Sequence, residues 1–161
     1  DKLVGLMQLG SGLPEQTIST LLGLIRGNVY RELVLKLLAS LCRYFFTPNF
    51  ARAVLDTIKS YLPNHIDLTV ERAKLVELKN SKELDSFDSS MRNLASLLHR
   101  IVDRTLNQPT PAEDIILQCY AYILQLSMLQ EKDIWASCLP SLMLIYYRQS
   151  QVNLPGSENL V

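Results

Sequence analysis

Apolar and polar residues recur along this chain with the spacing of α-helices. Between residues 28 and 46 the sequence NVYRELVLKLLASLCRYFF contains no Gly or Pro, and four of its polar side chains follow at intervals of four, four and three. These four are Glu32, Lys36, Ser40 and Arg43. A helix gathers such positions into one narrow stripe and leaves apolar surface on every other side. The pattern therefore predicts a helix packed between other helices.

Turn-forming residues divide the rest of the chain into further predicted helices. Thr47 is a favourable N-cap with Pro48 in the first turn, and Thr110 followed by Pro111 has the same character. The predicted helical segments are 1–9, 14–26, 50–62, 91–106, 114–129, 131–139 and 141–149. No segment alternates with period two between turn residues. The expected fold class is all-α.

Two segments lack a strong apolar pattern. Residues 64–90 are rich in charge, and we expect an exposed helix followed by a loop, an irregular charged insertion in a domain that spans residues 1–150. Its apolar residues are Leu68, Val70, Leu75, Val76 and Leu78. Residues 151–161 contain Pro155-Gly156 among polar residues, which predicts a flexible tail.

The chain contains an internal repeat. Residues 32–43 align with residues 114–125 at a fixed offset of 82 (114 minus 32), acid over acid and apolar over apolar. The polar stripe transfers to Asp114, Gln118, Tyr122 and Gln125. Pro14 and Pro140, each expected to open a helix, lie 126 residues apart (140 minus 14), or three steps of 42. Half of 82 is 41, and a period of roughly 40 to 47 residues is typical of helical solenoids.

The order of these elements resembles an armadillo repeat. A short helix is followed by a second that ends at Gly27, a long third helix, and then TPNFARAVL, which is similar to the "NPxxRxxL"-like opening of an armadillo unit. The resemblance covers residues 3–62 well, 91–147 moderately and 64–90 poorly. It implies a right-handed armadillo/HEAT-like stack of about eight to ten helices. An unrelated helical bundle whose similar helices recur by chance is the alternative.

Composition narrows the range of partners. The chain has 161 residues, 48% of them hydrophobic, and its 16 Lys and Arg balance 16 Asp and Glu. No global basic excess exists to attract nucleic acid or an anionic membrane. The longest uncharged run, residues 115–130, is shorter than the roughly 20 apolar residues of a membrane span. The first residue is Asp1 rather than Met, so we expect a piece of a longer protein whose neighbouring domains are further partners.

Candidate chemistry is sparse. His65 and His99 lack ligand-type neighbours one helical turn away, apart from Asp103 four residues after His99. The three cysteines are odd in number and form no CxxC pair, which favours reduced core residues over a zinc site and indicates an intracellular protein of the nucleus or cytoplasm. They are Cys42, Cys119 and Cys138. No phosphate-binding loop or nucleophile elbow is present. We therefore expect no catalytic residue, metal or cofactor.

Three arginines on the segment 91–106 indicate nucleic-acid binding as the alternative function. Arg92, Arg100 and Arg104 fall on one side of a helix and define an alternative nucleic-acid-binding module. Acidic residues are interleaved through residues 71–103 and would cancel much of this field, so a solvated face is favoured.

A protein partner is the main expectation. In armadillo-like solenoids the third helices line a groove, so the resemblance implies that the two polar stripes face a partner protein or peptide. The alternative is that both stripes only contact solvent. The expected partner-binding residues are Glu32, Lys36, Ser40, Arg43, Asp114, Gln118, Tyr122 and Gln125. Peptide-reading members present an Asn near the end of this helix, and this chain has Cys42-Arg43 and Leu124-Gln125 there. That departure favours helix-in-groove packing over capture of an extended peptide. The expected function is a non-enzymatic scaffold or docking domain.

A second candidate surface lies at the two ends of the expected stack. The terminal faces of a solenoid fragment lack a stacking neighbour, so a capping element or an adjoining domain would cover them. The apolar residues there are Leu3, Leu6 and Met7 at one end, and Leu142, Ile145, Tyr146 and Tyr147 at the other.

Overall fold

A computed structural model describes residues 15–26, 31–61, 65–129 and 131–153, and these ranges form seven α-helices with no strand. The helices are α2 (Glu15–Arg26), α3 (Arg31–Tyr44), α4 (Pro48–Tyr61), α5 (His65–Glu77), α6 (Ser81–Leu106), α7 (Glu113–Ser127) and α8 (Lys132–Asn153). The all-α prediction is confirmed for this part of the chain. The helix expected over residues 1–9 lies outside the described residues. The solenoid arrangement stays a prediction.

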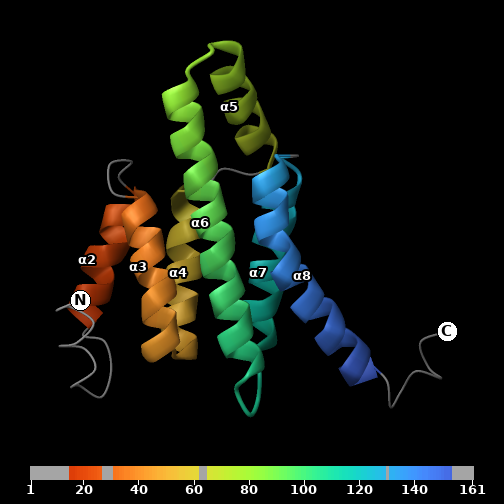
Figure 1. Cartoon of the computed structure of the whole chain (residues 1–161). Helices are drawn as coiled ribbons and strands as arrows, with labels where there is room; N and C mark the ends of the chain where they lie inside the picture. Colours follow the sequence, from red (N-terminus) through yellow and green to blue (C-terminus); the bar gives the residue numbers. More distant parts are fainter. Residues whose placement is uncertain (1–14, 27–30, 62–64, 130, 154–161) are drawn as a thin grey trace.

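Helix α6 is the centre of the packing. It has 26 residues and contacts α3, α5, α7 and α8, while α2 packs against α3 and α4 (Figure 1). Figure 1 shows α3, α6 and α8 side by side, with α4 and α7 behind them. The completely buried apolar side chains of α6 include Leu94, Leu97, Leu98 and Ile101. Their spacing of three, one and three residues places them on one helix face, so α6 presents a continuous apolar stripe to its neighbours.

The helix predicted over residues 28–46 is α3, as far as it is described. Leu35, Leu38 and Leu41 are completely buried, which agrees with a helix packed between others. Leu33 on the same helix is 63% exposed, so one apolar position faces solvent.

One predicted helix start is confirmed by the structure and another is wrong. The Thr47 hydroxyl accepts a hydrogen bond from the Phe50 N–H at 3.1 Å, so the N-cap prediction for α4 is confirmed. At α7 the N-cap is Ala112, without a side-chain hydrogen bond, and the predicted start at Thr110 is wrong. Glu113 and Asp114 occupy the first turn, where their charges favour the positive end of the helix dipole.

The region expected to be an irregular insertion is mostly helical. The predicted exposed helix is α5, but the predicted loop is wrong, because α6 begins at Ser81. Lys79, with a positive φ of 55°, lies in the short turn after α5. The Asn80 side chain then accepts a hydrogen bond from the Glu83 N–H at 3.2 Å and caps α6. Most of the described charged positions in this segment face solvent, whereas Arg72 is half-buried and Asp88 is buried.

Pro140 does not open a helix, contrary to prediction. It lies inside α8, which continues without interruption from Lys132 to Asn153. Proline has no N–H to donate to the Ala136 carbonyl, and the helix loses one hydrogen bond there. Ala136 and Pro140 are both exposed, so water can satisfy that carbonyl. Residues 151–153 of the predicted tail belong to α8, and residues 154–161 lie outside the described part.

The cysteine prediction is confirmed as far as burial and pairing are concerned. Cys42, Cys119 and Cys138 are buried and free. Within the described ranges, no helix is both long and apolar enough to cross a membrane.

Candidate functional site

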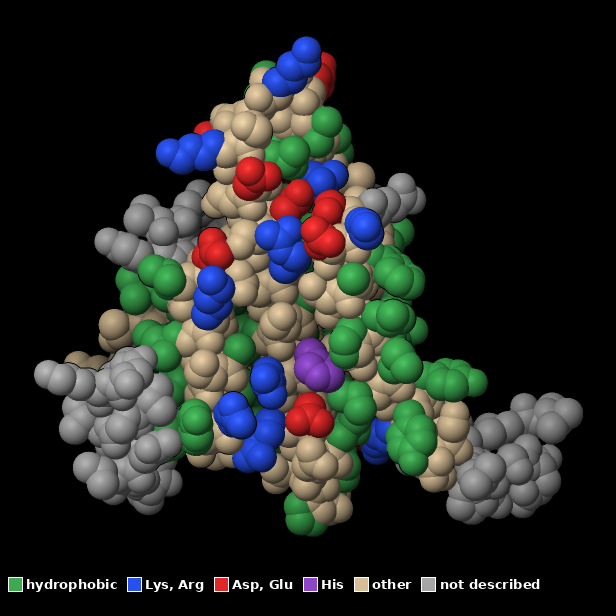
Figure 2. Space-filling view, in the orientation of Figure 1, with side chains coloured by type: hydrophobic (Ala, Val, Ile, Leu, Met, Phe, Trp, Pro, Cys, Tyr) green, Lys and Arg blue, Asp and Glu red, His purple; other side chains and the backbone are tan. Residues whose placement is uncertain are grey.

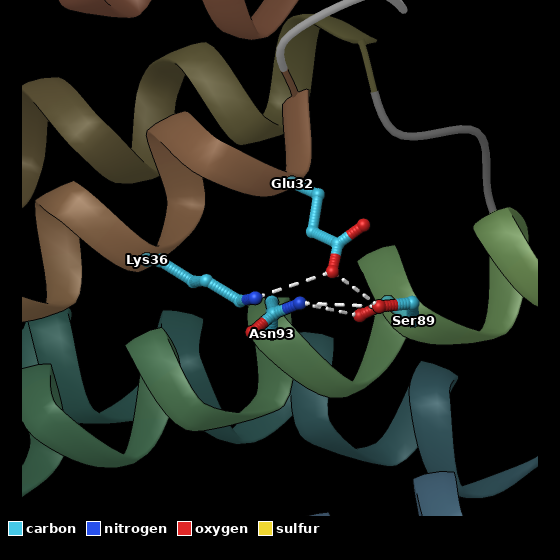
Figure 3. A network of polar contacts seen from close by, with 4 residues as sticks. All are labelled: Glu32, Lys36, Ser89 and Asn93. Atoms are coloured by element: carbon cyan, nitrogen blue, oxygen red, sulfur yellow. Dashed lines mark hydrogen bonds and ion pairs between the residues drawn. The ribbon is translucent and has the colours of Figure 1, made fainter.

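The predicted stripe on α3 lies beside α6. The Glu32 carboxylate accepts a hydrogen bond from the Ser89 hydroxyl at 2.6 Å and pairs with Lys36 at 3.3 Å (Figure 3). Asn93 donates to the Ser89 carbonyl at 2.8 Å in the same network. The Ser89 hydrogen bond and the Lys36 charge lower the pKa of Glu32, against the effect of burial. This half of the stripe joins two helices of the same chain.

The matching stripe on α7 meets a different helix. Asp114 accepts two hydrogen bonds from Arg52 of α4, at 2.9 and 3.2 Å, and these lower the pKa of Asp114. Tyr122 is buried, and its hydroxyl donates to the Leu55 carbonyl at 3.3 Å, while Gln118 contacts the same hydroxyl at 3.4 Å.

The structure does not bring the two stripes together on one surface. The α3 stripe adjoins α6, whereas the α7 stripe adjoins α4. The exposed members of the α3 stripe are Lys36, Ser40 and Arg43, and Gln125 on α7 is half-buried. Similar helices have thus packed against different neighbours.

Two rows of exposed apolar side chains lie on α7 and α8. The α7 row follows at intervals of three, four and four residues, and the α8 row at intervals of four, four and three, with one further Tyr. The residues are Leu117, Tyr120 and Leu124 on α7 with Met128 at its C-cap, and Trp135, Leu139, Met143, Tyr146 and Tyr147 on α8. Both spacings place a row on one face of its helix. We call these two rows the α7–α8 face.

Figure 2 shows apolar side chains gathered over α8 on the right of the molecule. Leu117 is 66% exposed, and Tyr146 is 75% exposed. Large apolar side chains collected in this way on a folded protein mark interaction surfaces more often than isolated ones do.

A groove of about 520 Å³ runs between the start of α7 and the end of α8. Its lining consists of Glu113, Ile116, Leu117, Tyr120, Leu142, Ile145, Tyr146, Arg148 and Gln149. The Arg148 guanidinium donates two hydrogen bonds to the Glu113 carboxylate, one of them at 3.2 Å, and this ion pair belongs to the lining. In Figure 1 the C-terminal part of α8 bends away from α6, and α8 contains Pro140. A proline inside a helix is a common cause of such a bend.

Sequence reasoning missed most of this face. The residues of both rows have visible helical spacing, but α7 is apolar nearly all round, and that pattern predicts a buried helix. Leu142, Ile145, Tyr146 and Tyr147 were expected at an end face of the stack, and the structure places the first three along the groove. Tyr147 is 64% exposed.

The arginines of the alternative function have separate environments. Arg100 is exposed and Arg92 is half-buried, while the Arg104 guanidinium lies over the Phe46 ring, 5.9 Å from its centroid. His99 is half-buried, and burial lowers its pKa while the Asp103 carboxylate opposes that shift. His65 begins α5. In the described part of the chain, no group of His, Cys, Asp or Glu residues is arranged to hold a metal ion.

No family model, curated protein or solved structure matches this chain.

Proposed function

We propose that this chain is a non-enzymatic protein-interaction module, a scaffold or docking domain of a larger intracellular protein. Its α7–α8 face binds an amphipathic helix of a partner protein. The observation that supports this function is the pair of exposed apolar rows with a groove between their helices. Nine of the fifteen large apolar side chains that are exposed in the described part of the chain belong to these two rows, so the rows form a distinct surface.

A helix is the occupant that fits this surface. The groove lies between two helices, and ridges of a third helix pack into such grooves with the same spacing of three and four residues. The described residues offer no sheet edge on which an extended strand could pair. An amphipathic helix would bury an apolar stripe on both rows.

The charges at the face do not select an acidic or a basic partner. Glu113 and Arg148 carry opposite charges in the groove, and Lys132 and Asp133 do so at the start of α8, near the α8 row. Because each site is balanced, the face has no strong preference for an acidic or a basic partner. Apolar contact therefore has to supply most of the affinity, with Leu117, Tyr120 and Tyr146 as anchors and Trp135 beyond the groove.

Site-specific photo-crosslinking tests this proposal. A photoreactive amino acid at position 117 or 146 of the full chain should capture one protein in cells, and the crosslinked segment of that protein should be an amphipathic helix. The matched control is position 33, because Leu33 is 63% exposed on α3, away from the face. Capture of a second copy of this chain, or equal capture from position 33, would contradict the proposal.

The α3 stripe is an alternative binding site for the partner, and binding of the same partner to a stripe variant tests it. Charge reversal of Lys36 and Arg43 changes the stripe without touching the α7–α8 face. We expect this variant to retain partner binding. Loss of binding by this variant, with binding retained after changes at positions 117 and 146, would assign the site to the stripe.

A further inference from the structure

A second hollow, distinct from the α7–α8 face, lies between the end of α3 and α6. It encloses about 130 Å³ and is lined by Ala39, Ser40, Arg43, Tyr44 and Arg100. Figure 2 shows several Lys and Arg side chains gathered over these two helices, with a single acidic side chain beside them. Arg43 and Arg100 are both exposed.

These two arginines differ from others in the described part of the chain. Arg52, Arg72 and Arg148 each donate two hydrogen bonds to one carboxylate. Arg43 and Arg100 make no ion pair with any residue that the structure describes. The hollow therefore holds two positive charges without a counter-charge.

A third arginine strengthens the positive field. Arg104 is one helical turn beyond Arg100, and both guanidiniums are close enough to Cys42 to favour its thiolate electrostatically. The acid nearest to them in sequence, Asp103, accepts a hydrogen bond from the Asn107 side chain at 3.5 Å. Arg100 and Arg104 lie near the end of α6 and Arg43 near the end of the neighbouring α3, so a bound anion would lower the repulsion among these like charges.

We propose that this hollow binds a phosphate monoester, carried either by a phosphorylated side chain or by a small phosphorylated molecule. Arg43 and Arg100 offer planar donor groups that match phosphate oxygens, and the hydroxyls of Ser40 and Tyr44 offer two further donors.

The size of the hollow favours a single phosphoryl group. Its volume of about 130 Å³ is a quarter of the 520 Å³ of the groove between α7 and α8, so a compact anion fits it better than an extended ligand does. A nucleic-acid backbone would need further free cations along the same track. One turn before Ser40, Lys36 is already paired with Glu32, so the cationic track does not extend along α3.

Titration of the intact chain tests the site, with NMR detection of the arginine side-chain N–H groups. The probes are inorganic phosphate, a short phosphoserine peptide and the same peptide without phosphate. We expect saturable shifts at Arg43 and Arg100 with the two phosphorylated probes only. Tighter binding of the phosphopeptide would assign the site to a phosphorylated protein segment, and equal binding would assign it to a small phosphate.

Matched variants complete the test. Arg43→Gln and Arg100→Gln should each weaken phosphate binding about tenfold, the loss expected for one charge-assisted hydrogen bond. Arg92 is an unpaired arginine on α6, the helix that carries Arg100, but it does not line the hollow. Arg92→Gln should therefore change the affinity for phosphate less than about twofold. Absence of saturable binding would overturn the proposal. So would equal weakening by Arg92→Gln, or tight duplex DNA binding that depends equally on Arg92.

Discussion

Burial controls the chemistry of the three cysteines. Burial raises the pKa of the Cys42 thiol to about 12 and that of Cys138 to about 11, and it raises the pKa of Cys119 further. Thiols with such pKa values remain protonated near neutral pH and react slowly. At the residue scale the sequence was informative here, because each cysteine stands among apolar positions of a helical pattern.

Alkaline pH should therefore destabilise the folded chain. The unfolded cysteines ionise near pH 8.5, whereas Cys42 and Cys119 keep their protons when folded. The folded state then binds more protons, and the free energy of unfolding falls as the pH rises, by about 1.4 kcal/mol per pH unit per thiol. The loss begins near pH 9 and continues to the folded pKa values.

Urea denaturation between pH 8 and pH 10.5 checks this expectation. A Cys42→Ala, Cys119→Ala variant will be less stable at every pH but should show a shallower pH slope. An identical slope in the variant would contradict the assignment.

At the scale of the helix, a partly buried ion pair joins α5 to α6. Arg72 donates two hydrogen bonds to Asp88, at 2.8 and 2.9 Å, and the two side chains are only 22% and 11% exposed. The ion pair also raises the pKa of Arg72. The sequence did not predict this contact, because the charges of residues 64–90 follow no spacing that identifies partners across two helices.

Asp88→Ala should destabilise the chain by about 2 kcal/mol, because it leaves a partly buried guanidinium unpaired. The estimate is lower than for a fully buried pair because Arg72 retains some solvent contact. Asp114→Ala breaks the exposed ion pair with Arg52 and serves as the control, with a smaller loss expected. The urea midpoint and the hydrogen exchange of the α5 amides measure the loss of stability in both variants. A midpoint unchanged by Asp88→Ala would contradict the role of this pair.

Pro140 predicted the start of a helix, but the longer helix α8 continues through it. Proline favours helix starts, but its cost inside a helix is limited when the carbonyl it leaves unpaired faces water. The flanking segments of α8 both have apolar positions at helical spacing, and their packing maintains one helix.

Pro140→Ala should stabilise α8, by up to about 3 kcal/mol, because it restores the hydrogen bond to the Ala136 carbonyl. It should also weaken partner binding, since a straighter α8 would move Leu142 and Ile145 in the groove. Calorimetry measures the rise in melting temperature. A lower melting temperature would show that the proline is required for the packing of α8.

For the whole molecule, the sequence predicted helices better than it predicted their neighbours. Residues 32–43 and 114–125 both lie in helices, and the matched residues Val34 and Ile116 are both buried. Leu35 is buried, however, whereas its counterpart Leu117 is 66% exposed. The repeat cannot indicate which helix each polar stripe meets, because that choice depends on α4 and α6 in three dimensions. The sequence did not predict the groove between α7 and α8 for the same reason, since the exposure of the α7 side chains depends on which face of α7 is covered.

The affinity of the partner helix for face variants tests the central claim most directly. The partner segment identified by crosslinking is synthesised as a peptide and titrated calorimetrically against the intact chain. Leu117→Asp with Tyr146→Asp changes the α7–α8 face, and Leu33→Asp with Leu78→Asp changes two apolar residues that are equally exposed elsewhere. We predict a loss of about 30-fold or more for the first pair and less than about twofold for the second. Equal affinities for the two double variants would contradict a docking site on the α7–α8 face.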